Sequence, residues 1–336
     1  MTCSFSISFL LTPLSGILAL KLGLVDRPNE RKIHKLPTPL LGGMAVFLGF
    51  IGGVLLNGIF QRPLLTILLA SSIIFIMGAI DDFKELPGIL KLFVQIFSVV
   101  YLIYNGIVLR VLPDSWGLVS DILNIILTII WIVGITNALN FFDGMDGLAA
   151  GLSIILSFFL GIVAFQTMQP FLGWISISIL GASAGFLPYN LRIRGGDAKI
   201  FLGDAGSTFL GFVLASLAVY GDWCSYNPIV AVASPLLIFW ILIFDMTYIT
   251  VERIATGKVS TFKEWIDYVG KDHLHHRLYR ILKGKRKTVF FIYLLAMTLC
   301  INAVALRNAR TIDALLLLFQ AALIVTILTI LERHES

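Results

Sequence analysis

Two amides and two carboxylates are crowded into ten residues of this chain, where a long apolar run ends. Asn137, Asn140, Asp143 and Asp146 follow one another at intervals of three, directly after the apolar run 122–136. Residues three apart lie on one face of a helix, so the first three side chains can point the same way, and the fourth joins them if the helix continues. Such a set of oxygen atoms, where a hydrophobic helix meets water, suits a hard cation with a phosphate beside it. The alternative is a polar helix cap, for which one carboxylate would be enough.

A further carboxylate stands among small residues just before another apolar run. Gly203, Gly206 and Ser207 surround Asp204. A helix that begins here offers free backbone N–H groups and the positive end of its dipole to an anion. The carboxylate can also hold Mg²⁺ against phosphate oxygens. An ordinary helix N-cap is the alternative interpretation.

Asp81 and Asp82 form an acidic pair at the end of the apolar run 64–80. Adjacent carboxylates repel each other unless a cation lies near, so the pair suits a general base or a cation partner. A solvated helix end is the alternative. Lys91 stands nine residues further on, where it can extend to the membrane surface or reach a bound phosphate.

Two loops carry cations suited to phosphate. The first contains Lys32 and His34 among three prolines, and a generic basic loop is the alternative there. The second contains His273, His275, His276 and Arg277, directly after Asp272. Crowded histidines without a well-placed fourth ligand are a weak zinc signal, so they are better interpreted as donors to a phosphate or a sugar phosphate.

Other charged residues near the last loop have simpler explanations. Asp245 lies inside the apolar run 229–249, and an ionisable residue within a membrane span is a functional-site candidate. A structural pair with Arg253 is the competing account. The basic stretch 283–287 is interpreted as a flank that faces anionic lipid.

The elements that must position these residues are membrane helices. The chain has 336 residues, of which 58% are hydrophobic and 13% charged, and its mean hydropathy is +0.92. Soluble domains carry about 25% charged residues, and the apolar runs are longer than the alternating strands of a membrane barrel. The three cysteines stand singly, which favours neither a disulfide framework nor a metal cluster.

We therefore expect an all-α, polytopic integral membrane protein with about eleven transmembrane helices. The expected spans lie near 4–22, 41–60, 64–80, 90–106, 119–139, 148–166, 171–188, 207–221, 229–249, 288–306 and 312–331. The first is interpreted as a retained helix rather than a signal peptide.

The distribution of Lys and Arg predicts the orientation. Of the 25 basic residues, only Arg62, Arg110, Arg307 and Arg310 fall on one side of this arrangement. The richly basic side is the cytoplasmic one, which places the N-terminus outside and the C-terminus in the cytoplasm. The chain 1–336 is then a single membrane domain, with an active site built from cytoplasmic loops near 23–40, 81–90, 140–147, 189–206 and 250–287.

Five motifs in order carry a family resemblance from Val25 to Leu278. They are DRPNERKIH with the following prolines and Gly42-Gly43, the Asp81-Asp82 pair, NALNFFDGMDGL, GDAGS and HLHHR. Together they resemble the polyprenyl-phosphate N-acetylhexosamine-1-phosphate transferases of glycosyltransferase family 4. The first and last motifs are similar to the bacterial initiating branch. The phospho-MurNAc-pentapeptide translocase has three consecutive histidines where this chain has His-Leu-His-His.

The resemblance implies a reaction at the cytoplasmic face of the bacterial inner membrane. Undecaprenyl phosphate attacks the sugar-bearing phosphate of a UDP-N-acetylhexosamine, and UMP leaves. Mg²⁺, or Mn²⁺ as the alternative ion, neutralises the diphosphate. The expected partners are the UDP-sugar, the polyprenyl phosphate and membrane lipids, without nucleic acid, and a homodimer is left open.

The resemblance also implies residue roles. The metal ligands are Asp204 and Asn140, and the catalytic residues are Asp81, Asp82, Asp143 and His275. The substrate-binding residues are Lys91, Asp146, Asn190, His273, His276, Arg277, Lys32 and His34. Which aspartate acts as a base, if any does, stays open.

One segment departs from the family pattern. About a dozen residues, 259–271, separate Lys258 from the histidine motif, where the family's loop is short. Because that loop helps to recognise the sugar, the resemblance leaves the N-acetylhexosamine open. The alternatives are the phospho-MurNAc-pentapeptide transferase and, from another class, a transporter for an anionic or metal substrate. A CDP-alcohol phosphatidyltransferase is set aside because Leu148-Ala-Ala follows the Asp-Gly start, where Ala-Arg would be needed.

Overall fold

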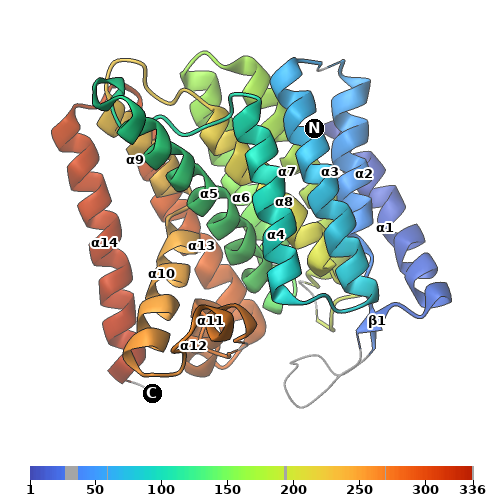
Figure 1. Ribbon diagram of the computed structural model, residues 1–336. Helices are drawn as coiled ribbons and strands as arrows, with labels where there is room; N and C mark the ends of the chain where they lie inside the picture. The colour runs from blue at the N-terminus through green and yellow to red at the C-terminus, as the bar shows by residue number, and fades with distance from the viewer. Residues whose placement is uncertain (27–36, 59, 193–194, 269, 335–336) are drawn as a thin grey trace.

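The computed structural model describes residues 1–26, 37–58, 60–192, 195–268 and 270–334. Helices make up almost all of this part of the chain (Figure 1). A small antiparallel sheet joins β1 (Val25–Asp26) to β2 (Thr38–Pro39), with Val25 opposite Pro39. The all-α membrane fold expected from composition is confirmed. Lys32 and His34 lie outside the described residues.

Each of the eleven predicted apolar segments is helical. The helices are α1 (Thr2–Leu22), α2 (Gly42–Leu56), α3 (Arg62–Phe83), α4 (Gly88–Tyr104), α5 (Leu118–Phe141), α6 (Leu148–Gln166), α7 (Pro170–Asn190), α8 (Gly203–Tyr220), α9 (Pro228–Ile238), α10 (Trp240–Ala255), α13 (Lys285–Ala305) and α14 (Thr311–His334). The N- and C-termini lie at opposite ends of the bundle (Figure 1).

Not all of these helices are long enough to cross a membrane alone. Among the described residues, eight helices have the length and composition of a span, or nine if α9 and α10, bent by 78° against each other, count as one. The expected eleven is therefore too high by this criterion. The difference lies in α2 and α4, whose 15 and 17 residues reach roughly 22 and 25 Å, short of a hydrocarbon core of about 30 Å.

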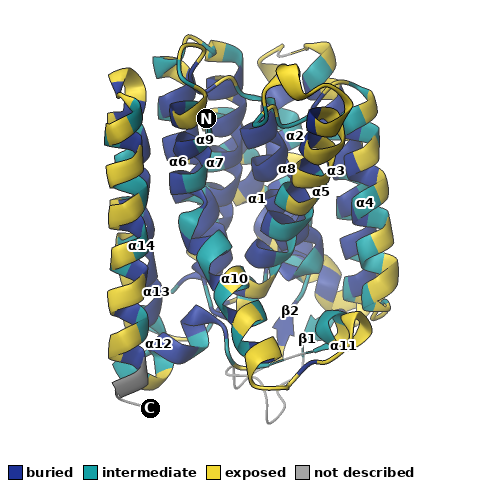
Figure 2. Ribbon diagram, turned by 60° about the vertical axis from the view of Figure 1, so that its left-hand side comes forward, coloured by how far each residue is buried: buried dark blue, intermediate teal, exposed yellow. Residues whose placement is uncertain are grey.

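Helix α8 is the centre of the bundle. Every residue from Ala205 to Val219 is buried, and α3, α5 and α2 pack around it. The helix lies inside the bundle, whereas α14 shows exposed residues along its outer side (Figure 2). The exposed residues of α14 include Leu316 and Phe319, which is the pattern of a lipid-facing helix.

Two glycines let the neighbouring helices approach the first turn of α8 closely. A Cβ atom on Gly78 of α3 would lie 2.6 Å from the Cα atom of Ala205, and one on Gly43 of α2 would lie 2.6 Å from that of Gly206. Side chains there would separate the helices. Because Gly78 and Gly43 have no side chain, the end of α3, with its acidic pair, lies against the start of α8.

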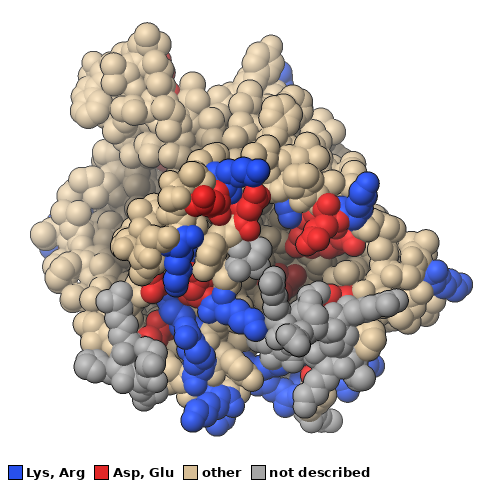
Figure 3. Space-filling model, turned by 60° about the horizontal axis from the view of Figure 1, so that its bottom comes forward, with Lys and Arg blue, Asp and Glu red and all other residues tan. Residues whose placement is uncertain are grey.

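Short elements gather at one end of the bundle. They are α11 (Phe262–Asp267), α12 (Leu274–Leu282) and the 3₁₀ turn η2 (Phe142–Gly144); the turns η1 (Asp114–Trp116) and η3 (Leu306–Asn308) lie elsewhere. Acidic and basic side chains surround a hollow on the face that carries α11 and α12 (Figure 3). The membrane helices thus hold their polar ends together on this one face.

Candidate active site

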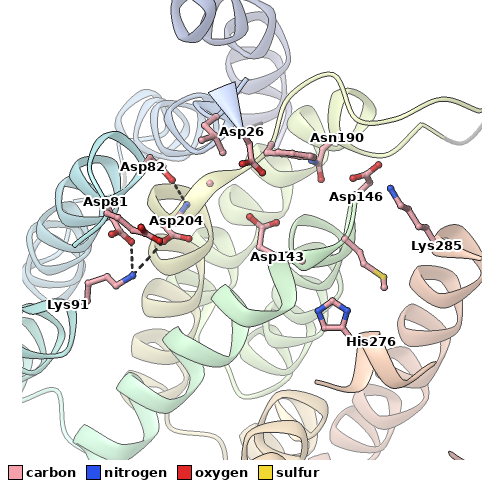
Figure 4. A pocket seen from close by; sticks show the side chains of 16 residues that line it. Asp26, Asp81, Asp82, Lys91, Asp143, Asp146, Asn190, Asp204, His276 and Lys285 are labelled. Carbon is pink, nitrogen blue, oxygen red and sulfur yellow. Dashed lines mark hydrogen bonds and ion pairs between the residues drawn. The ribbon is translucent and has the colours of Figure 1, made fainter. Parts of the chain in front are cut away.

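A cavity of about 460 Å³ opens at this charged end of the bundle. Carboxylates dominate its described walls, with two lysines and one histidine (Figure 4). The acidic residues are Asp26, Asp81, Asp82, Glu85, Asp143, Asp146 and Asp204, the lysines are Lys91 and Lys285, and the histidine is His276. The described walls thus carry seven acidic groups and two ammonium groups, and a cation in the cavity would offset the repulsion between the acidic groups.

One end of the cavity is organised around Lys91. Its Nζ atom lies 2.8 Å from Asp81 Oδ2 and 3.9 Å from Asp204 Oδ2. Asp81 Oδ1 accepts a hydrogen bond from the backbone N–H of Leu86 at 2.7 Å, and the Asp81 side chain is 2% exposed. Both Asp81 oxygens are therefore engaged, which indicates that this carboxylate positions Lys91 and the turn after α3.

Asp82 caps helix α8 from another helix. Its two oxygens accept hydrogen bonds from the backbone N–H groups of Asp204, at 2.8 Å, and Ala205, at 3.1 Å. These are N–H groups of the first turn of α8, which has no intrahelical partners for them. The start of α8 thus offers its N–H groups to an anion, as expected, and in the described structure that anion is the carboxylate of Asp82.

Asp204 and Asn140 lie together, as their predicted role as metal ligands requires. Asn140 Nδ2 donates to Asp204 Oδ1 and to Ser207 Oγ, both at 2.9 Å. The Asp204 side chain is 42% exposed and forms part of the cavity wall. Asn137 does not join them; it pairs with Gln95 at 2.7 and 3.2 Å, between α5 and α4.

Asp143 lies between the two ends of the cavity (Figure 4). Helix α5 ends at Phe141 and Asp143 has a non-helical ψ of 21°, so Asp146 does not continue the helical face of Asn140. Instead, Asp146 Oδ2 accepts from the backbone N–H of Ala198 at 3.2 Å. The break in the helix separates the two carboxylates and turns Asp146 toward the far end.

Asn190 is buried and fully engaged beside Asp146. Its Oδ1 accepts from the backbone N–H of Gly147 at 2.7 Å, and its Nδ2 donates to the carbonyl of Ile200 at 2.9 Å. The hydroxyl of Tyr293 donates to the carbonyl of Gly147 from the other side. Asn190 therefore fixes the backbone around Asp146, and its predicted contact with the nucleotide stays a prediction.

The histidine motif faces the cavity with one side chain, His276. His273 turns away: its Nδ1 lies 2.8 Å from Asp245 Oδ2, and the N–H of Leu274 donates to Asp245 Oδ1 at 2.7 Å. The pairing of Asp245 with Arg253 is wrong. Arg253 instead makes two hydrogen bonds to Asp272, at 2.8 and 2.7 Å.

His275 is 1% exposed and packs behind the turn that carries Asp143. Its ring lies 5.7 Å from that of Phe142, and neither ring nitrogen has a hydrogen-bond partner among the described groups. Burial and the nearby His276, His273 and Arg277 hold the pKa of His275 well below its usual range. His275 is thus a neutral side chain that supports the cavity wall.

His276 is also uncharged at neutral pH. Burial, with the charges of His273 and Lys271, lowers its pKa from 6.5 to about 4. A neutral imidazole can still donate one hydrogen bond to a phosphate oxygen. The interpretation of His276 as a donor to a phosphate therefore stays a prediction, whereas His275 is not among the described residues that line the cavity.

Arg277 points to the last helix rather than to the cavity. Its Nε donates to Glu332 Oε2 at 2.9 Å, its Nη1 to the carbonyl of Asp272 at 3.0 Å, and its guanidinium stacks 4.2 Å above the ring of Tyr248. Arg277 and Glu332 are 8% and 5% exposed. This buried pair holds α12 against α14, so the geometry gives Arg277 a positioning role.

Glu332→Ala should lower the stability of the protein by about 3–5 kcal/mol, because it leaves a buried arginine unpaired. Thermal unfolding in detergent measures the change. Asp313→Ala, which breaks an exposed pair with Arg310, is the matched control and should change stability little. Replacing both partners, Arg277→Met with Glu332→Met, should recover most of the loss; an unchanged melting temperature for Glu332→Ala would contradict the pairing.

The comparisons with known proteins agree with one another. The family model described as "Glycosyl transferase family 4" matches residues 64–222. The "Probable undecaprenyl-phosphate N-acetylglucosaminyl 1-phosphate transferase" of Bacillus subtilis (strain 168) is 33% identical, over 92% of this chain and 85% of the relative. The chain belongs to glycosyl transferase family 4.

Two further relatives are similar to this chain over most of their length. The "Decaprenyl-phosphate N-acetylglucosaminephosphotransferase" of Mycobacterium leprae (strain TN) is 32% identical, over 98% of this chain and 89% of the relative. The "Undecaprenyl-phosphate alpha-N-acetylglucosaminyl 1-phosphate transferase" of Yersinia pestis is 30% identical, over 89% and 81%. The resemblance drawn from the five motifs is confirmed, and with it a multi-pass transferase of the bacterial plasma membrane.

The part that the glycosyl transferase family 4 model matches does not include the whole cavity. Residues 64–222 contain Asp81, Asp82, Lys91, Asp143 and Asp204. Asp26, His276 and Lys285 come from outside that range. Asp26 and Glu85 line the cavity without being predicted site residues, although both stand in loops expected to form the site, and Lys285 was expected to lie in a lipid-facing flank.

Proposed function

We propose that this protein transfers N-acetylhexosamine 1-phosphate from a UDP-sugar to undecaprenyl phosphate at the cytoplasmic membrane face, with Mg²⁺ as cofactor. The observation that carries the proposal is the acid-rich cavity at one end of a membrane bundle, with Asp143 at its centre and one lysine at each end. Such a site suits two phosphorylated substrates that meet around a cation.

The donor set around Asp204 fits Mg²⁺. Within the described residues no group of three or more His, Cys, Asp and Glu has the geometry of a metal site. Mg²⁺ is commonly held by one or two carboxylates together with substrate phosphates and water, so Asp204 and Asn140 would hold it with the help of the substrate. Bound there, Mg²⁺ would supply positive charge to the diphosphate.

The polyprenyl phosphate is best placed at the Lys91 end. Helix α4, which carries Lys91, exposes Leu90, Phe93 and Phe97 on its outer side, at 44%, 66% and 57% exposure. This apolar face lets an isoprenoid tail stay in the membrane while its phosphate reaches Lys91. The UDP-sugar then occupies the other end, near Asp146.

The reaction needs little covalent help from the protein. An oxygen of the lipid phosphate attacks the sugar-bearing phosphorus, the bond to the UMP phosphate breaks, and UMP leaves with its electron pair. A phosphate monoester is already mostly ionised at pH 7, so positioning and charge neutralisation contribute most. Asp143, between the two ends, is the carboxylate best placed to orient the attacking phosphate.

We propose N-acetylglucosamine as the first sugar to test, because all three relatives described above carry it in their names. The phospho-MurNAc-pentapeptide substrate is less suited, since this chain has His-Leu-His-His in place of three consecutive histidines.

The test is UMP release by the purified protein with undecaprenyl phosphate, Mg²⁺ and a panel of UDP-N-acetylhexosamines. We expect release with UDP-N-acetylglucosamine and its loss with EDTA. Release with another donor would replace the sugar assignment, and no release with any donor would contradict the proposed function.

The helix of the inserted segment, α11, lies against Gly88 at the start of α4, the helix that carries Lys91. Trp265 Nε1 donates to Thr250 Oγ1 of α10 at 3.2 Å. Phe262 is 67% exposed and stacks on Trp265, at the edge where a lipid would enter. The insertion is thus better placed to act on the lipid acceptor than on the sugar.

Replacing residues 260–270 by a short Gly-Ser linker should raise the KM for undecaprenyl phosphate several-fold, because an apolar surface beside α4 is lost. The order of preference among UDP-sugars should stay the same. Initial-rate kinetics with each substrate varied in turn measure both quantities. A changed sugar preference with an unchanged KM for undecaprenyl phosphate would show that the insertion acts in sugar recognition instead.

A further inference from the structure

The second lysine of the cavity has no role in the reaction described so far. Lys285 is the first residue of α13, and it lies across the cavity from Lys91, beside Asp146 (Figure 4). It stands outside the residues that the family model matches. The structure therefore corrects the interpretation of residues 283–287 as a flank that only faces lipid.

Among the residues that the structure describes, the ammonium group of Lys285 is not held by a short contact. Its Nζ atom lies 3.9 Å from Asp197 Oδ1, which is beyond hydrogen-bonding distance. The two side chains are 25% and 35% exposed. Lys91, in contrast, lies 2.8 Å from a buried carboxylate. Lys285 thus keeps its donors available to a group that enters the cavity.

Two other polar side chains at this end, Asp146 and Asn190, are already bonded to the protein backbone. Asp146 accepts from Ala198, and both ends of the Asn190 amide are used. The N-terminal end of α13 adds positive partial charge beside Lys285. An anion that enters this acid-rich end needs a cation to offset the carboxylates, and among the described lining residues Lys285 supplies it.

We infer that Lys285 binds a phosphate group of the UDP-sugar diphosphate. This inference rests on the proposed function, because it takes the Lys91 end for the lipid phosphate. An ammonium group binds phosphate oxygens as a mobile point charge with three donors. Lys285 and Lys91 then hold the two phosphorylated substrates on opposite sides of Asp143.

The experiment compares Lys285→Ala and Lys285→Arg with two controls. Arg286→Ala changes the adjacent cation, whose contact is with the carbonyl of Gly196. Asp197→Asn removes the ion pair of Lys285 but keeps the lysine. The readouts are the dissociation constant of UDP with Mg²⁺, the KM of each substrate, kcat and the melting temperature.

Lys285→Ala should weaken UDP binding and raise the donor KM, each about tenfold, the effect of losing one charge-assisted hydrogen bond. The acceptor KM should stay unchanged, and Lys285→Arg should recover most of the loss. Arg286→Ala and Asp197→Asn should bind UDP at least as well as the unmodified protein.

Two results would overturn the inference. Lys285→Ala could bind UDP as tightly as the unmodified protein, or Asp197→Asn could weaken binding as much as Lys285→Ala does, which would show that the lysine only holds the loop. UDP binding needs no turnover. If the unmodified protein bound UDP but released no UMP, and Lys285→Ala lost UDP binding, the inference about Lys285 would be supported. The proposed function would be contradicted. An unmodified protein that does not bind UDP would overturn both.

Discussion

Asp204→Asn should lower kcat by roughly a thousandfold while the protein still folds, the scale of losing one preorganised electrostatic group. Asparagine can keep the acceptor oxygen that Asn140 Nδ2 contacts at 2.9 Å. It replaces the other oxygen, which faces Lys91 at 3.9 Å, with an uncharged amide. The proposed Mg²⁺ site would lose its anionic ligand, whereas the packing of α8 would stay the same.

UMP release at saturating substrate, over a range of Mg²⁺ concentrations, measures this effect, and thermal unfolding in detergent checks the fold. Asp313→Asn is the matched control, because that carboxylate pairs with Arg310 in an exposed i,i+3 contact. Turnover close to normal in Asp204→Asn would remove this residue from the metal site. A large fall in melting temperature would instead mean that Asp204 holds the structure.

Asp82→Ala should affect both activity and stability. It removes the two hydrogen bonds to the N–H groups of Asp204 and Ala205 and leaves those groups without a partner. We expect a loss of about 2–4 kcal/mol of stability. We also expect a roughly hundredfold lower kcat, because a displacement of about 1 Å at a reacting centre has an effect of that size.

A matched cap exists far from the cavity. Asn227 accepts from the backbone N–H groups of Ile229 and Val230 at the start of α9, so Asn227→Ala removes a similar pair of bonds. The stability of the Asn227→Ala variant should fall, but its kcat should stay the same. If Asp82→Ala lost activity without losing stability, Asp82 would act on the substrate rather than on helix α8.

The membrane fold was predictable because it depends on local signals. Each apolar run is helical in the structure, and the run 229–249 forms two helices, α9 and α10. The run at 41–60 became a helix of 15 residues that ends at Leu56, whereas the run at 90–106 kept its length of 17 residues as α4, shifted by two positions. The 78° bend between α9 and α10 was likewise not expected.

The candidate site was predictable as a set of loops but not as a set of contacts. Asp82 reaches the backbone of a residue 122 positions away, and Arg277 pairs with a residue 55 positions away. No spacing rule connects such partners. Because Asp245 and Arg253 lie close together along one helix, a pair between them was the competing account. In the structure, Asp245 instead pairs with His273 and Arg253 with Asp272.

The complete burial of α8 has a consequence for how the protein is made. Helix α8 is the least hydrophobic of the eight long spans, since almost none of its surface faces lipid, and membrane helices commonly insert first and associate afterwards. Its partners α2, α3, α5, α6 and α7 all precede it in the chain. During synthesis, α8 therefore enters a membrane in which its binding partners are already present, and the hydrogen bond from the Asp204 N–H to Asp82 is one of the contacts that α8 can then make.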